Sequence, residues 1–269
     1  MNKIIASGII LLSASLAKAQ FKPQLSVPMP SQGTGTHKVL IEEFTETGCG
    51  ACAQYDTTFQ KITDNNADKA IVINYHCFYS EDPFYNYNKL GYQRYKFYNI
   101  KDGFPSVMVN GKMPSPSSAH MNYVTAPLIS RLYNTPPSLD INISTSKAKT
   151  GAHAIDINVQ TTALKDLNTD SLRLFAVVTE NNIDYKARYH SEAINGINKY
   201  NHMFRAMLTD TIGMRMTPQV KGNVSSFRLS YANDDKEINY KEVRIVAFIQ
   251  DLRTREVIAV AETPSNPFK

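Results

Sequence analysis

The chain has 269 residues, of which 42% are hydrophobic and 20% are charged, and its formal net charge is +5. This length allows one large domain or two domains of ordinary size. The basic residues are scattered, without the stripe that nucleic-acid binding requires, so no nucleic-acid partner is expected.

The N-terminus has the pattern of a secretory signal. Lys3 precedes a short apolar run, and Ala17-Lys18-Ala19 is a small-x-small cleavage site. The run is too short to cross a bilayer, and no later segment is apolar enough to form a transmembrane helix. Residues 1–19 are predicted to be a signal peptide and residues 20–37, rich in proline, serine and glycine, an extended leader. The protein is therefore expected to be exported to the periplasm or associated with an outer membrane, where disulfides persist.

A strand that leads into two closely spaced cysteines follows the leader. Residues 39–45 are an apolar, β-branched run typical of a buried strand, and residues 52–65 have helical spacing. Cys49 and Cys52 thus form a C-x-x-C at the first turn of a helix, the thioredoxin-type redox arrangement. The helix N-terminus favours a thiolate, so Cys49 is predicted to attack and Cys52 to resolve the mixed disulfide. A structural disulfide without turnover is the alternative.

An aromatic segment comes next. Residues 70–75 read as a second buried strand, and residues 76–98 contain nine tyrosine and phenylalanine rings, with a helix predicted over 87–98. The rings either form the core face of this helix or make a lid beside the disulfide that grips unfolded peptide, and both can hold for different rings. Cys77 follows the apolar strand and is predicted to be buried.

A third strand is predicted just after Pro105, ending in an Asn-Gly turn, with an antiparallel strand after Gly111 and a helix over residues 126–133. Together with the C-x-x-C, the Phe104-Pro105 strand resembles the thioredoxin-like proteins over residues 38–130. In that family a cis-proline opens a strand that faces the disulfide.

The thioredoxin resemblance implies roles for several residues. Glu43, six residues before Cys49, corresponds to the buried acid that relays the proton of the resolving thiol, and the substrate site corresponds to Phe104, Pro105 and Gly48. Gly48 replaces the family's usual tryptophan, and Ala51 replaces its common proline. The redox potential and the substrate class therefore stay open.

Two adjacent carboxylates need to be told apart. In a regular strand Glu42 and Glu43 point to opposite faces, and for both of them a solvated strand end is the alternative to a functional role. The spacing to Cys49 favours Glu43 as the functional one. The apolar residues 39–41 and Phe44 around it should lie inside a covered parallel sheet, and burial should raise the pKa of Glu43 above about 4.3. The rival interpretation turns Glu42 inward and leaves Glu43 in solvent.

The second half of the chain has a different sequence pattern. Two prolines within residues 134–138 mark a domain boundary. Beyond it, alternation of apolar and polar residues predicts six strands, at residues 139–146, 154–162, 171–180, 226–230, 243–250 and 257–262. Residues 181–208 interrupt the pattern, and residues 200–207 within them are predicted to be helix or loop. An immunoglobulin-like sandwich over residues 138–269 is expected.

A closer resemblance combines these features. The signal peptide, the lead of residues 41–45 into the C-x-x-C, the aromatic insert and a sandwich bearing His202 and Arg205 resemble the twenty-eight-kilodalton outer-membrane-protein family of Gram-negative envelopes. That family pairs a thioredoxin-like domain with a β-rich tail. The expected fold is thus an α/β thioredoxin-like domain at residues 38–134 followed by an all-β sandwich at residues 138–269.

Two functions follow from this organisation. The first is an exported thiol–disulfide oxidoreductase or isomerase that acts on cysteine-containing exported proteins or peptides. The second is a non-catalytic envelope binding or assembly protein that uses the thioredoxin fold as a scaffold. Structural zinc usually needs four ligands, and a second C-x-x-C is absent, so no metal or other cofactor is expected. A peripheral position at the outer membrane is compatible with either function.

Overall fold

The structure, a computed structural model, describes residues 37–87, 89–149, 151 and 153–268. The predicted signal peptide and nearly all of the predicted leader lie outside these residues. Tertiary contacts group the described residues into one compact unit. Within the described part of the chain, no helix is both long enough and apolar enough to span a membrane.

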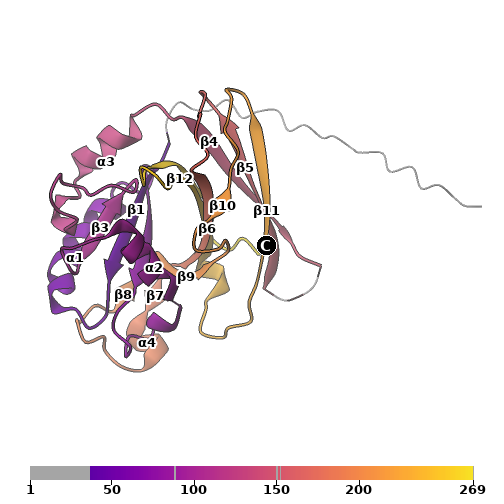
Figure 1. Cartoon of the computed structure of the whole chain (residues 1–269). Coiled ribbons are helices and arrows are strands. Elements are labelled where there is room, and N and C mark those ends of the chain that lie inside the picture. The colour runs from indigo at the N-terminus through magenta and orange to yellow at the C-terminus, as the bar shows by residue number, and fades with distance from the viewer. Residues whose placement is uncertain (1–36, 88, 150, 152, 269) are drawn as a thin grey trace, which may run out of the picture. The chain divides into compact units, whose positions relative to one another are not determined.

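A mixed sheet of eight strands runs through the described chain (Figure 1). Its strands are hydrogen-bonded in the order β13-β12-β6-β9-β2-β1-β3, and β10 pairs with β6. Strand β1 pairs in parallel with β2 and antiparallel with β3, so β1 is flanked by strands on both sides. The bounds are β1 (Val39–Thr45), β2 (Ala70–His76), β3 (Ser106–Val109), β6 (Leu172–Glu180), β9 (Met203–Met207), β10 (Met214–Arg215), β12 (Val243–Asp251) and β13 (Val257–Glu262).

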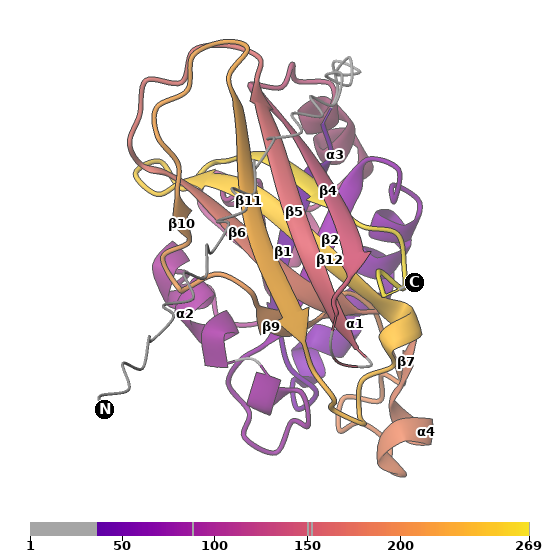
Figure 2. The same ribbon diagram turned by 90° about the vertical axis from the view of Figure 1, so that its right-hand side faces the viewer.

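A second, antiparallel sheet of three strands lies against one part of the large sheet (Figure 2). It consists of β4 (Leu139–Lys147), β5 (Ala154–Ala163) and β11 (Val224–Ala232). Inward-facing residues such as Ile157 of β5 share one core with Leu174 of β6 and Ile245 of β12. The alternating pattern therefore located these strands to within two residues of their ends. An immunoglobulin-like topology stays a prediction.

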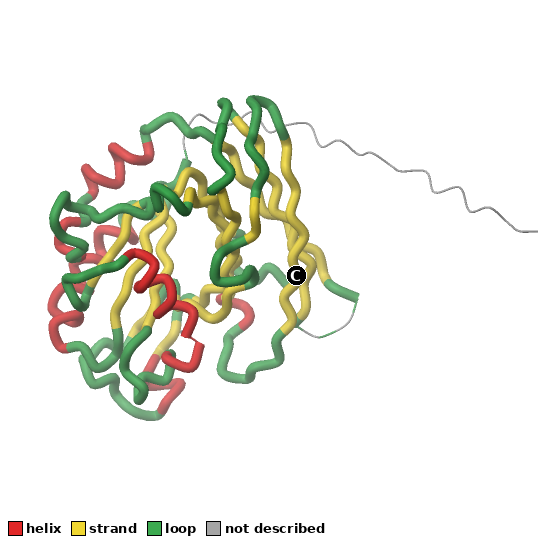
Figure 3. Tube along the Cα trace, viewed as in Figure 1, coloured by secondary structure: helices red, strands yellow, loops and turns green. Residues whose placement is uncertain are grey.

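Helices cover the β1–β3 end of the large sheet (Figures 1 and 3). The α-helices of the described residues are α1 (Gly50–Asp64), α2 (Lys89–Tyr98), α3 (Ala126–Tyr133) and α4 (Tyr185–Tyr189). Single turns of 3-10 helix occur at η1 (Tyr85–Tyr87), η2 (Met121–Tyr123) and η3 (Tyr240–Glu242). Phe59 of α1 and Ile129 of α3 pack on Ile41 of β1. Tyr98 of α2 packs with Leu40 and Phe44, which point to the opposite face of β1. Strand β1 is consequently buried along its whole length.

Two local predictions are wrong. Residues 200–207 are not helix or loop: β8 (Lys199–Tyr200) pairs with β7 (Ile183–Asp184), and Met203–Met207 forms β9. Strand β9 finds its partners in β6 and β2, which are distant in sequence, so local pattern could not reveal it. The antiparallel strand predicted after Gly111 does not form: between β3 and β4 the described residues make only isolated bridges, Val109–Lys112, Ser115–Ser118 and Ser106–His120.

The predicted boundary at residues 134–138 lies between α3 and β4, yet packing crosses it. The backbone N–H of Asn74 in β2 donates to the carbonyl of His202, 2.8 Å away, just before β9. A single core also combines Phe44 of the first half with Phe175 and Phe248 of the second. Independent folding of the two halves stays a prediction, and the shared core leads us to expect the halves to remain associated after cleavage at the boundary.

Candidate functional site

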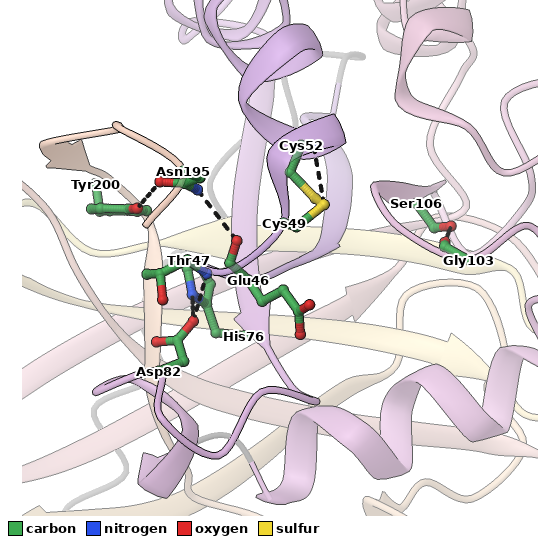
Figure 4. The surroundings of a disulfide bond; sticks show 10 residues. All are labelled: Glu46, Thr47, Cys49, Cys52, His76, Asp82, Gly103, Ser106, Asn195 and Tyr200. Carbon is green, nitrogen blue, oxygen red and sulfur yellow. Dashed lines mark hydrogen bonds and ion pairs between the residues drawn. A yellow bond between two sulfur atoms is a disulfide. The ribbon is translucent and has the colours of Figure 1, made fainter. Parts of the chain in front are cut away.

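Cys49 and Cys52 form a disulfide at the N-terminus of α1 (Figure 4). Cys49 is the N-cap residue, and the backbone N–H of Cys52 donates to its Sγ atom at 3.0 Å. Cys49 is partly exposed, whereas Cys52 is fully buried. An N–H donor and the positive end of the helix dipole at this sulfur stabilise a thiolate there. The accessible and electrostatically favoured sulfur is therefore that of Cys49.

The loop before β3 lies in the surroundings of the disulfide. The Phe104–Pro105 peptide bond is cis, as predicted. Pro105 is buried, and β3, which begins with the next residue, pairs Ser106 with Phe44 of β1. Gly103 and Ser106, on either side of the cis bond, are joined by a hydrogen bond from the Ser106 hydroxyl to the Gly103 carbonyl (Figure 4). Gly103 and Ser106 thus belong to the surroundings of the disulfide (Figure 4).

Tyr79 lies against the glycine that precedes the disulfide. A Cβ atom on Gly48 would stand 3.1 Å from Cδ1 of the Tyr79 ring, closer than ordinary van der Waals contact. A large side chain at position 48 would therefore displace this ring. Sequence reasoning did not single out Tyr79, although it lies in the aromatic segment.

The aromatic segment divides into buried and exposed rings. Phe84 and Tyr98 are core residues. Phe78 is 42% exposed, and its ring contacts those of Tyr92 and Phe104 with centroid distances of 4.7 and 4.6 Å. Some rings therefore form the core, and others form a partly exposed cluster that includes Phe104 of the cis peptide bond.

Glu42 lies on the α2 side of β1 with its charge fully paired. Arg94 of α2 donates from Nε to Oε1 at 2.9 Å and from Nη2 to Oε2 at 2.8 Å. Tyr75 and Tyr98 donate their hydroxyls to the same carboxylate. The third guanidinium nitrogen of Arg94 donates to Gln250 of β12, 2.8 Å away. This buried network joins β1, β2, α2 and β12.

Glu43 lies on the α1 side of β1 and is unpaired. It is 2% exposed, and its Oε1 atom has no hydrogen-bond partner. Burial, and secondarily the nearby Asp56, raises the pKa of Glu43 well above its ordinary value. The predicted burial and the predicted direction of the pKa shift are confirmed. The alternatives that leave either glutamate in solvent are wrong, because helices and strands cover both faces of β1.

Asp56 was missed in the sequence. It lies four residues after Cys52 on the same face of α1 and is 6% exposed. Gln60 donates to its Oδ2 atom at 3.1 Å, while Oδ1 has no hydrogen-bond partner. Burial raises the pKa of Asp56 to about 6, against the opposing effects of His76 and Gln60. The four-residue spacing from a buried cysteine is the signal that could have revealed it.

A histidine–aspartate pair holds the turn before the disulfide. Nδ1 of His76, at the end of β2, lies 2.6 Å from Oδ2 of Asp82. The same oxygen accepts the backbone N–H of Thr47 at 2.7 Å (Figure 4). Burial alone would raise the pKa of Asp82, but His76 and the backbone donors outweigh it and lower the pKa. Cys77 is buried, as predicted, and burial raises the pKa of its thiol.

The second half of the chain also contacts this turn. The backbone N–H of Asn195 donates to the Thr47 carbonyl at 2.9 Å, and its side-chain Nδ2 donates to the Glu46 carbonyl at 3.3 Å. The Tyr200 hydroxyl in turn donates to Asn195 Oδ1 (Figure 4). The neighbouring Ile194 is 69% exposed. Residues far apart in sequence thus frame the C-x-x-C.

His202 and Arg205 belong to a different cluster. Arg205 is buried and forms an ion pair with Glu180, with Nη2 and Oε2 2.6 Å apart. Arg188 binds the other oxygen of Glu180 at the same distance. Burial lowers the pKa of His202 to about 4. These contacts give His202 and Arg205 a role in packing around β9.

Two cavities of about 400 and 460 Å³ lie beside Lys112 and Met113. The first reaches α3 and β13, and the second reaches the end of α2. Neither is lined by Cys49 or Cys52. The disulfide therefore lies outside both cavities, at a surface turn.

Comparison with known proteins places the chain. A family model described as outer membrane protein Omp28 matches residues 92–267, well over half of the sequence. The chain belongs to the Omp28 family. This membership confirms the predicted exported, outer-membrane-associated location. The Omp28 match begins within α2 and so leaves out both disulfide cysteines. No curated protein sequence matches the chain.

Comparison with solved structures shows which folds this Omp28-family member resembles. HBP35 of Porphyromonas gingivalis is 15% identical, with a TM-score of 0.68 over 86% of this chain and 76% of that chain. A protein from Agrobacterium tumefaciens is 12% identical, with a TM-score of 0.50 over 85% and 93% of the two chains. A domain of the outer membrane lipoprotein Omp28 from P. gingivalis is 17% identical over 48% of this chain and 96% of its own, with a TM-score of 0.35. The likeness to HBP35 shows a shared fold.

Proposed function

We propose that residues 38–134 form a thioredoxin-like redox unit and that the protein is an exported thiol–disulfide oxidoreductase or isomerase. The observation that carries this proposal is the disulfide at the N-terminus of α1, with Cys49 partly exposed and Cys52 buried. The cis Phe104–Pro105 bond in the neighbouring loop and the buried Glu43 support it. A purely structural disulfide requires none of these surroundings.

The chemistry is two successive thiol–disulfide exchanges. The thiolate of Cys49 attacks a substrate disulfide, forms a mixed disulfide with one substrate sulfur and releases the other, which takes up a proton. Cys52 then loses its proton and attacks Sγ of Cys49. The Cys49–Cys52 disulfide closes, and the second substrate sulfur leaves and is protonated. The substrate is reduced by two electrons and the protein is oxidised; the reverse sequence oxidises a substrate.

The substrate class proposed is a cysteine-containing exported protein or peptide, bound in an extended form. The disulfide lies at a surface turn, which suits a polypeptide better than a small enclosed ligand. Gly48, Phe104 and Pro105 are the proposed contacts, and Phe78 and Tyr79 border them. Exposed rings bind apolar side chains, so we expect a preference for apolar residues next to the substrate cysteine.

Insulin reduction in the presence of dithiothreitol tests the proposal. The wild-type protein should accelerate precipitation of the insulin B chain, and Cys49→Ser should abolish the acceleration. Cys77→Ser is the matched control and should retain it, because the Cys77 thiol is buried. No acceleration of either insulin reduction or the refolding of a scrambled disulfide protein would leave the alternative, a non-catalytic envelope binding or assembly protein.

A further inference from the structure

A group of buried polar side chains lies between α1 and the sheet. The parallel register pairs Glu43 with Asn74 and Thr45 with His76, so these side chains share the face of the sheet that α1 covers. On α1, Cys52 and Asp56 point to the same face, and both are buried. In a helix the Cα–Cβ bonds tilt toward the N-terminus, so the Asp56 side chain leans toward the turn that holds Cys52.

The oxygens of this group are incompletely hydrogen-bonded. Oδ1 of Asp56, Oε1 of Glu43 and Nε2 of His76 are buried atoms without a hydrogen-bond partner. Gln60 occupies only Oδ2 of Asp56. A buried polar atom without a partner is costly, and native proteins retain such atoms where they serve chemistry. The free oxygen of Asp56 is therefore available to a group beside it on α1.

Building on the proposed redox function, we propose that Asp56 takes the proton of Cys52 when Cys52 resolves the mixed disulfide, and that Glu43 is its protonated neighbour. The spacing of four residues places a carboxylate beside the buried thiol on one helix face. A proton acceptor must be ionised before it can act. Asp56 meets this condition near neutral pH, since its pKa is raised only to about 6.

Glu43 is less suited than Asp56 to accept this proton, because it is the more deeply buried of the two carboxyls. Burial with no partner for Oε1 raises its pKa well above the ordinary value, and Asp56 adds to the shift. When two buried carboxyls lie close together, repulsion between two negative charges favours the state in which they share one proton. One member of the pair is then neutral and the other is charged. Glu43, the more deeply buried, is the neutral member. With Glu43 protonated, Asp56 is the carboxylate that can accept the proton of Cys52.

The proton balance is simple. As the thiol of Cys52 transfers its proton to Oδ1 of Asp56, its sulfur attacks Sγ of Cys49, and the bond between Cys49 and the substrate sulfur breaks. The departing substrate thiolate takes a proton from solvent, and Asp56 later returns one to solvent. No further oxidant or reductant enters the step.

Charged and titratable groups around Asp56 come from every neighbouring element. They are Glu43 on β1, His76 on β2, Cys52 on α1 and Tyr200 on β8, with Asp82 bound to His76. His76 opposes the rise in the pKa of Asp56. Replacing His76 should therefore raise the pH at which Asp56 becomes active.

Reaction of the reduced protein with 5,5′-dithiobis(2-nitrobenzoate) tests the inference without a natural substrate. Attack by Cys49 releases one thionitrobenzoate, and resolution by Cys52 releases the second in a later phase. In wild type the second phase should accelerate with pH, with a midpoint near the Asp56 pKa of about 6. Asp56→Asn should remove this pH limb and slow the second phase on the order of 100-fold, with the first phase unchanged.

Two comparisons separate this role from a structural one. Asp64→Asn, on an exposed position of the same helix, should match wild type in both phases. Glu43→Gln should slow the second phase only slightly. A larger loss in Glu43→Gln than in Asp56→Asn would overturn the assignment, as would equal slowing of both phases in Asp56→Asn.

A measurement on the unaltered protein guards against a variant that does not fold. Carboxyl-carbon NMR of the oxidised wild type should show Asp56 titrating near pH 6 and Glu43 releasing its proton at a higher pH than Asp56. Ionisation of Glu43 below Asp56 would refute the proposal. Failure of insulin reduction with normal two-phase kinetics would instead reject only the proposed substrate class.

Discussion

Glu42 and Glu43 are neighbours on one strand, equally buried, and opposite in chemistry. Glu42 receives donors from Arg94, Tyr75 and Tyr98, whereas Glu43 has an oxygen with no donor at all. Burial makes a charge costly unless partners compensate it. The face of β1 toward α2 supplies those partners, and the face toward α1 does not. One face therefore holds a carboxylate paired with Arg94, and the other holds a carboxyl whose pKa is raised by burial.

The two faces also differ in what they connect. The Arg94 guanidinium lies over the rings of Phe175 and Phe248, 4.9 and 5.2 Å from their centroids, so the Glu42 face ties the first half of the chain to β6 and β12. The Glu43 face leads to Cys52 and the disulfide turn. We infer that the first face serves stability and the second serves reactivity.

The largest test of this comparison removes the charge of Glu42. Glu42→Gln leaves the buried Arg94 without its counter-ion, and breaking one side of a buried pair costs about 3–5 kcal/mol. Urea denaturation at pH 7 measures the loss. Glu81→Gln, an exposed glutamate, is the control and should change stability by less than about 0.5 kcal/mol. If Glu42→Gln were as stable as the control, the Glu42 face would have no structural role.

The matching substitution on the other face, Glu43→Gln, should raise the stability of the protein instead of lowering it. Folding raises the pKa of Glu43, so the folded state keeps a proton that the unfolded state has released, and stability falls as pH rises above the ordinary pKa of 4.5. Glu43→Gln removes this effect. Its stability relative to wild type should grow by up to about 1.4 kcal/mol for each pH unit above that value. Parallel pH–stability curves of the two proteins would contradict a neutral, buried Glu43.

The sequence predicted the burial of Glu43 on one face of β1 but did not predict the ion pair of Glu42 on the other. The alternation along β1 predicts that Glu42 and Glu43 point to opposite faces, and the spacing from Cys49 identified Glu43 as a candidate. Alternation alone, however, is normally interpreted as one buried face and one solvent-exposed face of the strand. Arg94, which forms the ion pair with Glu42, and Gln250, which binds Arg94, are 52 and 208 residues from Glu42 in the chain. The contact of Arg94 with Gln250 joins the two halves of the chain, and no local pattern encodes the pairing of β9 with β2 that connects β12 to β1 in the sheet. Asp56, by contrast, was within reach of a helical spacing argument.

A smaller loss of stability is expected when a single hydroxyl is removed from the Glu42 face. The hydroxyl of Tyr98 donates to Glu42 and accepts from Arg94 Nη2 and Gln250 Nε2, at 2.7 and 2.9 Å. Tyr98→Phe removes these bonds but keeps the ring and the ion pair, and should cost about 1.5–3 kcal/mol, because a hydrogen bond to a charged group is lost. Tyr55→Phe on the partly exposed side of α1 provides the control for thermal denaturation. A loss as large as that of Glu42→Gln would mean that the hydroxyl network, not the ion pair, holds this face.

The smallest expected change concerns the turn above the Glu43 face. The Asn195 side chain donates to the Glu46 carbonyl and accepts from Tyr200, while its backbone N–H holds Thr47 independently of the side chain. Asn195→Ala should therefore cost only about 1 kcal/mol of global stability. Locally it should loosen the turn, so amide hydrogen exchange should accelerate at residues 46–49 and stay unchanged in β12. Equal acceleration in both regions would show that the two faces of β1 open together, and the division between a stable face and a reactive face would fail.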